Sequence, residues 1–193
     1  MSEIEKNPRQ RIIETALRLF YQQGFLATGI NQIIAESNVA KATFYSHFPS
    51  KEQLCVAYLQ ARHTIWMDWL KKSIDNQPTP LTRLLGIFDF IREWMSTCDF
   101  RGCAFLNIAS EIPCLDSVIR NEVVRHKDSL KGYISRLLTE VEDSGTPPLD
   151  TDRQQIVDML YVLVEGAIVA SQNYGQIWPI DAARQAAERL VKH

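Results

Sequence analysis

Cysteine and histidine are scarce in this chain, with four residues of each among 193. The cysteines form no C-x-x-C pair, and no histidines stand at the spacing of a zinc site. The pattern therefore predicts no metal site. We expect Cys55, Cys98, Cys103 and Cys114 to be reduced thiols in a cytoplasmic protein.

Long apolar runs are also missing. The longest, residues 159–170, is interrupted by Glu165 and Gly166, and its twelve residues are too few to span a bilayer. The first ten residues, MSEIEKNPRQ, are charged and contain no apolar run, so they do not resemble a signal peptide. These absences predict a cytoplasmic protein with no membrane partner.

Motifs of the common enzyme classes are absent too, because the chain has no G-x-S-x-G, H-E-x-x-H, P-loop or Rossmann glycine pattern. We therefore expect no enzyme, no catalytic residues and no cofactor. No segment alternates convincingly between polar and apolar residues, so no strand is predicted. Apolar residues recur instead at helical spacing, and helix-capping signals appear at Asn7-Pro8, Ser50-Lys51-Glu52-Gln53 and Thr79-Pro80.

These patterns predict an all-α chain of about nine helices. The last three are predicted over residues 116–144, 151–174 and 181–192, and Gly145-Thr146-Pro147-Pro148 separates the first two of them. Charge is uneven along the chain, although the net charge is only −2. Residues 1–51 contain six Lys or Arg and four Asp or Glu, whereas residues 52–193 contain fifteen and nineteen. The N-terminal quarter is therefore the part best suited to meet nucleic-acid phosphates.

Residues 40–46 predict a helix of only two turns, preceded by another short helix and the turn Ser37-Asn38-Val39. A helical wheel places Ala40, Phe44 and Phe48 on one side of this segment and small or hydrogen-bonding groups on the other. Two short helices joined by such a turn are typical of a helix-turn-helix, whose second helix enters the major groove of DNA.

The outward residues of this segment have the properties that DNA contacts need. Small side chains at Ala42 and Thr43 let the backbone approach base edges, while lysine, tyrosine and histidine suit phosphate contacts. The hydroxyl of Thr28 is expected to meet another phosphate. The predicted DNA-binding residues are Thr28, Lys41, Ala42, Thr43, Tyr45, Ser46, His47 and Lys51. The residues alone leave open a second interpretation, a small three-helix subdomain with a solvated polar face.

Residues 9–54 resemble the N-terminal domain of the TetR family of transcriptional regulators. The residues at the family's spacing are Ala16-x-x-Leu19-Phe20, Gly24-Phe25, Thr28, Val39 and Lys41-x-Thr43-Phe44-Tyr45-x-His47-Phe48-x-x-Lys51. The resemblance implies a helix-turn-helix domain over residues 1–52 and an effector-binding and dimerisation domain over residues 53–193. It further implies a homodimeric repressor that a small lipophilic effector releases from a palindromic DNA operator.

The chain departs from the family's pattern at four positions. Ala40 and Ala42 stand where the family often has serine and glycine, and Asn38 stands where it often has glycine. Gly29 lacks a hydroxyl that many members carry at the start of the second helix. The missing serine cap is expected to lower the affinity for DNA without changing the fold.

In TetR-like proteins the last two helices form the seam between two subunits. Here the helix predicted over residues 151–174 is apolar almost all round, which indicates burial on two sides. A central core helix of a monomer is the alternative that the pattern leaves open. The resemblance implies a dimer interface that contains Leu163, Gly166, Ala170, Ala183, Ala187 and Leu190.

The middle helices carry aromatic and aliphatic residues with few polar groups, a lining that suits a small lipophilic ligand. Ordinary core packing accounts for the same residues, and a hydrogen-bonded core histidine accounts for His126. The candidate pocket residues are Trp66, Phe88, Ile91, Trp94, Met95, Phe105, Asn107, Glu111, His126, Tyr133, Leu137, Tyr161 and Glu165.

Two other hypotheses remain open at this stage. One is a helical protein–protein adaptor, which salt-dependent binding to specific DNA would exclude, because only phosphate contacts release counterions. The other is a regulator that senses redox state through Cys98 and Cys103, although buried cysteine is commonly just a small hydrophobic residue.

Overall fold

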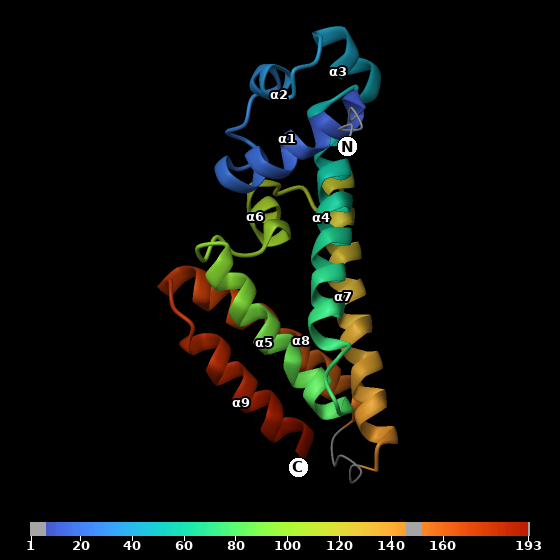
Figure 1. Cartoon of the computed structure of the whole chain (residues 1–193), viewed down its shortest axis with the longest axis vertical. Coiled ribbons are helices and arrows are strands. Elements are labelled where there is room, and N and C mark those ends of the chain that lie inside the picture. The colour runs from blue at the N-terminus through green and yellow to red at the C-terminus, as the bar shows by residue number, and fades with distance from the viewer. Residues whose placement is uncertain (1–6, 146–151, 193) are drawn as a thin grey trace, which may run out of the picture. The chain divides into compact units, whose positions relative to one another are not determined.

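The computed structural model describes residues 7–145 and 152–192, and these residues form α-helices and no strand (Figure 1). This confirms the predicted all-α fold. The nine helices of the described residues are α1 (Pro8–Gln23), α2 (Ile30–Glu36), α3 (Lys41–His47), α4 (Lys51–Ile74), α5 (Pro80–Thr97), α6 (Ala104–Glu111), α7 (Val118–Asp143), α8 (Arg153–Tyr174) and α9 (Trp178–Lys192).

Several helices begin at the capping signals that the sequence contains. At α1, the Asn7 side chain accepts a hydrogen bond from the Gln10 backbone N–H at 2.8 Å, and Pro8 occupies the first turn. At α5, Thr79 and Thr82 form a reciprocal capping box. Such caps satisfy backbone N–H groups that have no partner inside the helix, so local residues set where these helices start.

The last helices differ slightly from their predicted bounds. α7 covers residues 118–143 instead of 116–144. α9 begins at Trp178, three residues before the predicted start, because the Ile177 carbonyl accepts hydrogen bonds from the backbone of Ile180 and Asp181. Pro179 fits this first turn, where its fixed φ is already helical. Residues 146–148 of the predicted break and the predicted start of α8 at residue 151 lie outside the described residues.

The chain forms two compact units. The first joins residues up to Ile65 with Ala104–Arg125, and the second joins Trp66–Cys103 with the residues from His126 onward. These units do not follow the predicted boundary after residue 52, because α6 and the beginning of α7 pack with the N-terminal helices. The predicted division into functional domains therefore stays a prediction.

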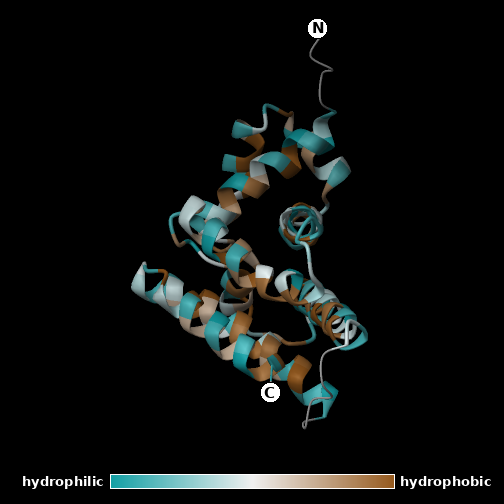
Figure 2. Ribbon diagram, turned by 60° about the horizontal axis from the view of Figure 1, so that its bottom comes forward, coloured by the Kyte–Doolittle hydropathy of each residue, from teal (hydrophilic) through white to brown (hydrophobic). Residues whose placement is uncertain are grey.

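The two units have separate apolar cores, and hydrophobic and hydrophilic residues alternate along the helices around them (Figure 2). In the first unit, Phe20 packs edge-to-face against Tyr58 with 5.4 Å between ring centroids. In the second unit, α9 packs against α8 and α5, and fully buried residues such as Ile91 and Leu137 fill the interior. Burial of these side chains from water is the main stabilising term of each unit.

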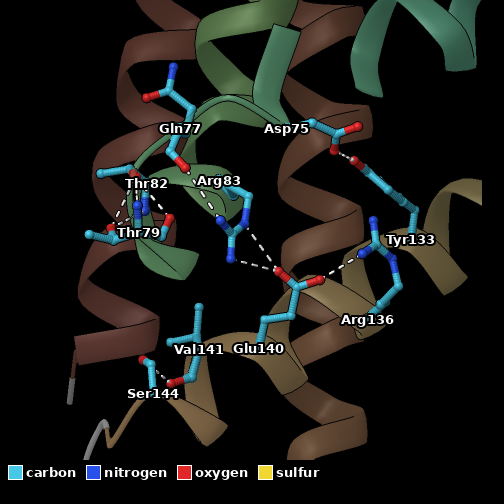
Figure 3. A network of polar contacts seen from close by, with 10 residues as sticks. All are labelled: Asp75, Gln77, Thr79, Thr82, Arg83, Tyr133, Arg136, Glu140, Val141 and Ser144. Carbon is cyan, nitrogen blue, oxygen red and sulfur yellow. Dashed lines mark hydrogen bonds and ion pairs between the residues drawn. The ribbon is translucent and has the colours of Figure 1, made fainter. Parts of the chain in front are cut away.

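A polar network joins the beginning of α5 to α7 at the edge of the second unit (Figure 3). The Arg83 guanidinium donates to Glu140 at 3.1 Å and to the Gln77 carbonyl at 3.3 Å, while Arg136 pairs with the other Glu140 oxygen at 2.6 Å. Nearby, the Tyr133 hydroxyl donates to Asp75 at 3.4 Å. These groups are partly exposed, so we expect them to orient the α4–α5 turn while contributing little to stability.

α8 is long and apolar enough to cross a membrane by length and composition, with an 18-residue window of mean hydropathy 1.2 of which 39% is buried. The sequence argument from a twelve-residue apolar run is therefore wrong about this helix. Core helices of soluble proteins meet the same criterion, and α8 packs against α9 and α5 within the chain. The composition of α8 is explained as well by subunit packing as by a membrane.

Candidate functional site

The short helix α3 is fixed by apolar residues on one edge. Phe44 is fully buried and Phe48 nearly so, with 6.3 Å between their ring centroids. The preceding turn places Asn38 at φ 52°, a left-handed conformation that asparagine tolerates better than most residues. This confirms the predicted turn between α2 and α3. The opposite edge of α3 is consequently held toward solvent.

Most of the predicted contact residues of α3 lie on that outer edge. Lys41, Ala42, Tyr45, Ser46 and His47 are exposed, and Thr43 is half-buried. The Ser46 hydroxyl donates to the Thr43 carbonyl at 2.8 Å, so it is already engaged within the helix. α3 begins at Ala40 without a side-chain cap, as its sequence predicts. The arrangement presents one cation, one imidazole and small polar groups on an exposed two-turn helix.

Thr28 does not belong to this exposed surface, which corrects its predicted phosphate contact. Its side chain is fully buried, and its hydroxyl donates to the Gly24 carbonyl at 2.7 Å. That carbonyl lies at the end of α1, where no further helical turn follows to satisfy it. The hydroxyl therefore closes the α1–α2 connection rather than facing a ligand.

Replacing Thr28 with valine tests this assignment. We expect Thr28→Val to lower the free energy of unfolding by about 1 kcal/mol, because a buried hydrogen bond is lost, and to leave the salt dependence of DNA binding unchanged. Urea unfolding and DNA titrations at several salt concentrations measure the two effects. Thr64→Val makes the same chemical change at an exposed position of α4 and should alter stability little. Unchanged stability together with a flatter salt dependence would restore Thr28 to the phosphate contacts.

Lys51 and Glu111 hold the same α1–α2 connection from two sides. The Glu111 carboxylate accepts hydrogen bonds from the backbone N–H of Phe25 at 3.1 Å and of Leu26 at 2.6 Å. The Lys51 ammonium lies 4.5 Å from the Phe25 ring centroid and 3.4 Å from the Leu26 carbonyl. Partial burial lowers the pKa of Lys51, although the Glu111 carboxylate acts in the opposite direction.

These contacts change the predicted roles of both residues. Glu111 is not a polar anchor of an effector pocket, because both carboxylate oxygens are engaged by the backbone of the first compact unit. Lys51 is half-buried against Phe25, so its predicted phosphate contact would need the side chain to leave this position. Phe105 and Asn107 also belong to the first compact unit, whereas the other candidate pocket residues belong to the second.

Aromatic side chains gather in the second compact unit. Trp66 makes edge-to-face contacts with Trp94 and His126, at centroid distances of 5.7 and 5.5 Å, and with Phe90 at 5.3 Å. The structure thus brings together three of the predicted pocket residues and adds Phe90. The indole N–H of Trp66 is buried and has no hydrogen-bond partner among the described residues. Phe88, Ile91, Met95, Tyr133 and Leu137 are buried core residues.

An open groove of about 460 Å³ lies beside this aromatic cluster. Trp94 is the predicted pocket residue that lines it. The prediction missed Trp69, which is half-exposed at this groove, because helical periodicity does not tell a solvent-facing tryptophan from a core one. The groove is lined by Trp69, Lys72, Ser73, Phe90, Glu93, Trp94 and Thr97.

Glu165, another predicted pocket residue, forms a nearly buried ion pair. The Lys127 ammonium lies 2.8 and 2.7 Å from the two Glu165 oxygens and 3.5 Å from the Cys103 sulfur. The pKa of the neighbouring Tyr161 is raised, first by burial and then by the Glu165 charge. The sequence analysis missed Lys127, because nothing in its local sequence distinguishes it from a surface lysine. All four cysteines are free thiols.

α8 and α9 leave apolar side chains exposed along a shared face. Val162 is 64% exposed, and Met159, Val169, Tyr174 and Trp178 are also exposed on these helices. Two shallow grooves of about 490 and 300 Å³ run along this face, and Leu163 lines both. We call this surface the α8–α9 face and define it by the groove residues Asp158, Met159, Val162, Leu163, Gly166, Ala170, Trp178, Ala182, Ala186 and Leu190.

The α8–α9 face contains four of the six predicted interface residues. Leu163, Gly166, Ala170 and Leu190 line its grooves. Ala187 is fully buried and Ala183 nearly so, which corrects their prediction as outward residues. Both alanines lie on the inner side of α9, where their small side chains allow close packing within the chain. The exposed alanines of α9 are Ala182 and Ala186.

Comparisons with known proteins agree with this architecture. Residues 12–58 match the model of "Bacterial regulatory proteins, tetR family", and residues 80–187, more than half of the chain, match "Tetracyclin repressor-like, C-terminal domain". The chain is 24% identical to the HTH-type transcriptional repressor DhaR of Mycobacterium sp. strain GP1 over 90% of this chain and 86% of that protein.

Shorter and structural matches point the same way. The HTH-type transcriptional regulator LmrA of Bacillus subtilis is 51% identical over 49 residues, which are 25% of this chain and 26% of that protein. A crystal structure of a TetR-family transcriptional regulator from Streptomyces coelicolor superposes with a TM-score of 0.83 and 26% identity over 96% of both chains. The chain therefore belongs to the TetR family of helix-turn-helix transcriptional regulators.

Proposed function

We propose that the protein is a cytoplasmic repressor that binds a palindromic DNA operator as a homodimer and leaves it when a small lipophilic effector binds. The observation that carries this proposal is the exposed outer edge of α3. It presents Lys41, Thr43, Tyr45 and His47 on a helix whose opposite edge is anchored by Phe44. A protein–protein adaptor has no need for this set of groups, and its binding would not depend on counterion release.

Different residues of α3 are assigned different kinds of contact. Ala42 and Thr43 are small enough for the helix to approach base edges, and the threonine methyl and hydroxyl can meet a thymine methyl or a base acceptor. Lys41, Tyr45 and His47 carry groups that suit phosphates, which position a protein on DNA without selecting the sequence. Thr28 is left out of this set, because its hydroxyl is bonded inside the protein.

Lys41→Ala tests the proposed DNA contact. We expect weaker binding to all DNA sequences and a salt dependence that is about one unit shallower, because one phosphate contact and its released counterion are lost. Fluorescence anisotropy of labelled DNA at several salt concentrations measures both. Lys71→Ala removes an equally exposed lysine on α4 in the other compact unit and should change neither value. Equal salt slopes for Lys41→Ala and the unmodified protein would contradict the assignment.

The α8–α9 face is proposed as the seam of the homodimer. Val162 and Met159 are exposed at the centre of an apolar surface, and a second copy of the same face would cover them. Gly166 has open space where a Cβ would be, so it permits close approach of a helix from the other subunit. Twofold symmetry would then place two α3 helices on two halves of a palindromic site.

The aromatic cluster and its groove in the second compact unit are proposed as the region that receives a lipophilic effector. Trp66, Phe90 and Trp94 supply apolar surface, and the unpaired Trp66 N–H is a donor for an acceptor atom on a ligand. Such an effector needs only unequal affinity for the DNA-competent and DNA-incompetent states. A coupling free energy of about 1–3 kcal/mol would change operator affinity by about 5- to 150-fold.

A further inference from the structure

A cysteine, a lysine and a glutamate meet in the second compact unit, and the proposed lipophilic site does not use them. The Cys103 sulfur lies 3.5 Å from the Lys127 ammonium, which is held by both oxygens of Glu165. We propose that Cys103 is a covalent sensing site for small soft electrophiles of the α,β-unsaturated carbonyl class. Adduct formation on its sulfur is then a second way to control the regulator.

Sulfur, and not the lysine nitrogen, is the nucleophile in this cluster. Burial alone would lower the pKa of Lys127, but the Cys103 sulfur and the Glu165 carboxylate outweigh it, so the pKa lies above its ordinary value. Lys127 therefore stays protonated at neutral pH and has no free electron pair. Its positive charge stabilises negative charge on the sulfur, and thiolate is the reactive form of cysteine.

The other cysteines lack this arrangement. Burial is the main cause that raises the pKa of Cys55 to about 12, which keeps it a thiol. The Cys98 thiol lies 3.6 Å from the Met95 carbonyl, an acceptor rather than a cation. Cys114 is exposed and lies between α6 and α7. The chain thus contains its own controls for a reaction assigned to Cys103.

The backbone before Cys103 is held in unusual conformations. Asp99 and Phe100 have φ values of 51° and 53°, and Gly102 has φ 80°. A Cβ on Gly102 would lie 2.1 Å from the Gln172 side-chain oxygen, so glycine is required there and the turn is closely packed. Cys103 itself is only 5% exposed, which restricts the site to small electrophiles.

The reaction is a conjugate addition that consumes no oxidant. The thiol proton passes to water, and the thiolate electron pair forms a bond to the β-carbon of the electrophile. The carbon–carbon π electrons move to form an enolate, which takes a proton from water at the α-carbon. The product is a saturated thioether, and the Lys127 ammonium is unchanged at the end.

The adduct would be coupled to DNA binding through α6. Cys103 is the residue immediately before α6, and Glu111 at the end of α6 holds the backbone of Phe25 and Leu26 after α1. An added group on Cys103 displaces the start of this short helix and loosens the Glu111 contacts. This step rests on the proposed DNA-binding function, whereas the reactivity of Cys103 does not.

Methyl vinyl ketone is the probe for the experiment, applied to the full-length protein and followed by peptide mass spectrometry. We expect the unmodified protein to react at Cys103 and to release operator DNA at the same rate. Lys127→Met combined with Glu165→Gln removes both charges without leaving either unpaired, and should slow the Cys103 reaction about tenfold or more. Lys127→Arg keeps the charge and should react within a few-fold of the unmodified rate. A bulky dye maleimide should label Cys114 in preference to Cys103.

Two cysteine variants separate the possible outcomes. Cys103→Ser should bind DNA normally and resist release by methyl vinyl ketone, whereas Cys114→Ser should still be released. The proposal is overturned if Cys103 reacts equally fast without the Lys127 charge, or if Cys103→Ser is released as readily as the unmodified protein. Failure to bind DNA before any reagent is added would instead refute the proposed function, and the adduct rates would still test the cysteine.

Discussion

A single charge at the centre of the α8–α9 face should convert the dimer into monomers. Val162 is 64% exposed in the isolated chain and lines both grooves of that face, so Val162→Glu changes few contacts inside the chain. In the proposed dimer the new carboxylate would be buried against apolar side chains without a partner, which costs several kcal/mol. Analytical ultracentrifugation measures the change in oligomeric state.

The same variant should lose operator affinity although its α3 helix is untouched. A dimer engages both half-sites together, and the loss of that linkage lowers affinity by about a hundredfold to ten-thousandfold. Val124→Glu is the matched control, because Val124 is a 52% exposed valine on α7 in the other compact unit. It should remain dimeric and bind DNA normally. A Val162→Glu protein that is dimeric with full affinity would place the interface on a different surface.

Removal of the Lys127 charge alone should strongly destabilise the protein. The side chains of Lys127 and Glu165 are only 12% and 17% exposed, so Lys127→Met leaves a nearly buried carboxylate without its cation. Breaking such a pair costs about 3–5 kcal/mol, whereas removing both charges is often close to neutral. We therefore expect urea unfolding to show a large loss for Lys127→Met and recovery of most of it when Glu165→Gln is added.

This cycle also separates the ion pair from simple packing. If the methylenes of Lys127 are what matters, methionine supplies comparable volume and the single variant should be as stable as the unmodified protein. Equal stability of the single and double variants would likewise show that Glu165 is solvated well enough without its partner. Either result would remove the structural role that the geometry assigns to the pair.

The fold and the exposed edge of α3 were predictable because their determinants are local. The Asn7 and Thr79 caps act within three residues, and the alternation of Phe44 with polar neighbours fixes the two edges of α3. Thr28 was placed wrongly because burial of its hydroxyl depends on the path of the chain after Gly24. Sequence spacing shows that a residue is near a helix start, but not which way its side chain faces after packing.

The amino-acid sequence by itself determined the helices, the helix-turn-helix and the family, because capping and periodicity are interactions between near neighbours in the chain. Tertiary structure alone decided that Glu111 holds the backbone of Phe25, 86 residues away, and that Lys127 meets Glu165, 38 residues away. It also decided which alanines of α9 face inward. Such contacts depend on how helices pack, and many residues with the same local pattern have no comparable partner.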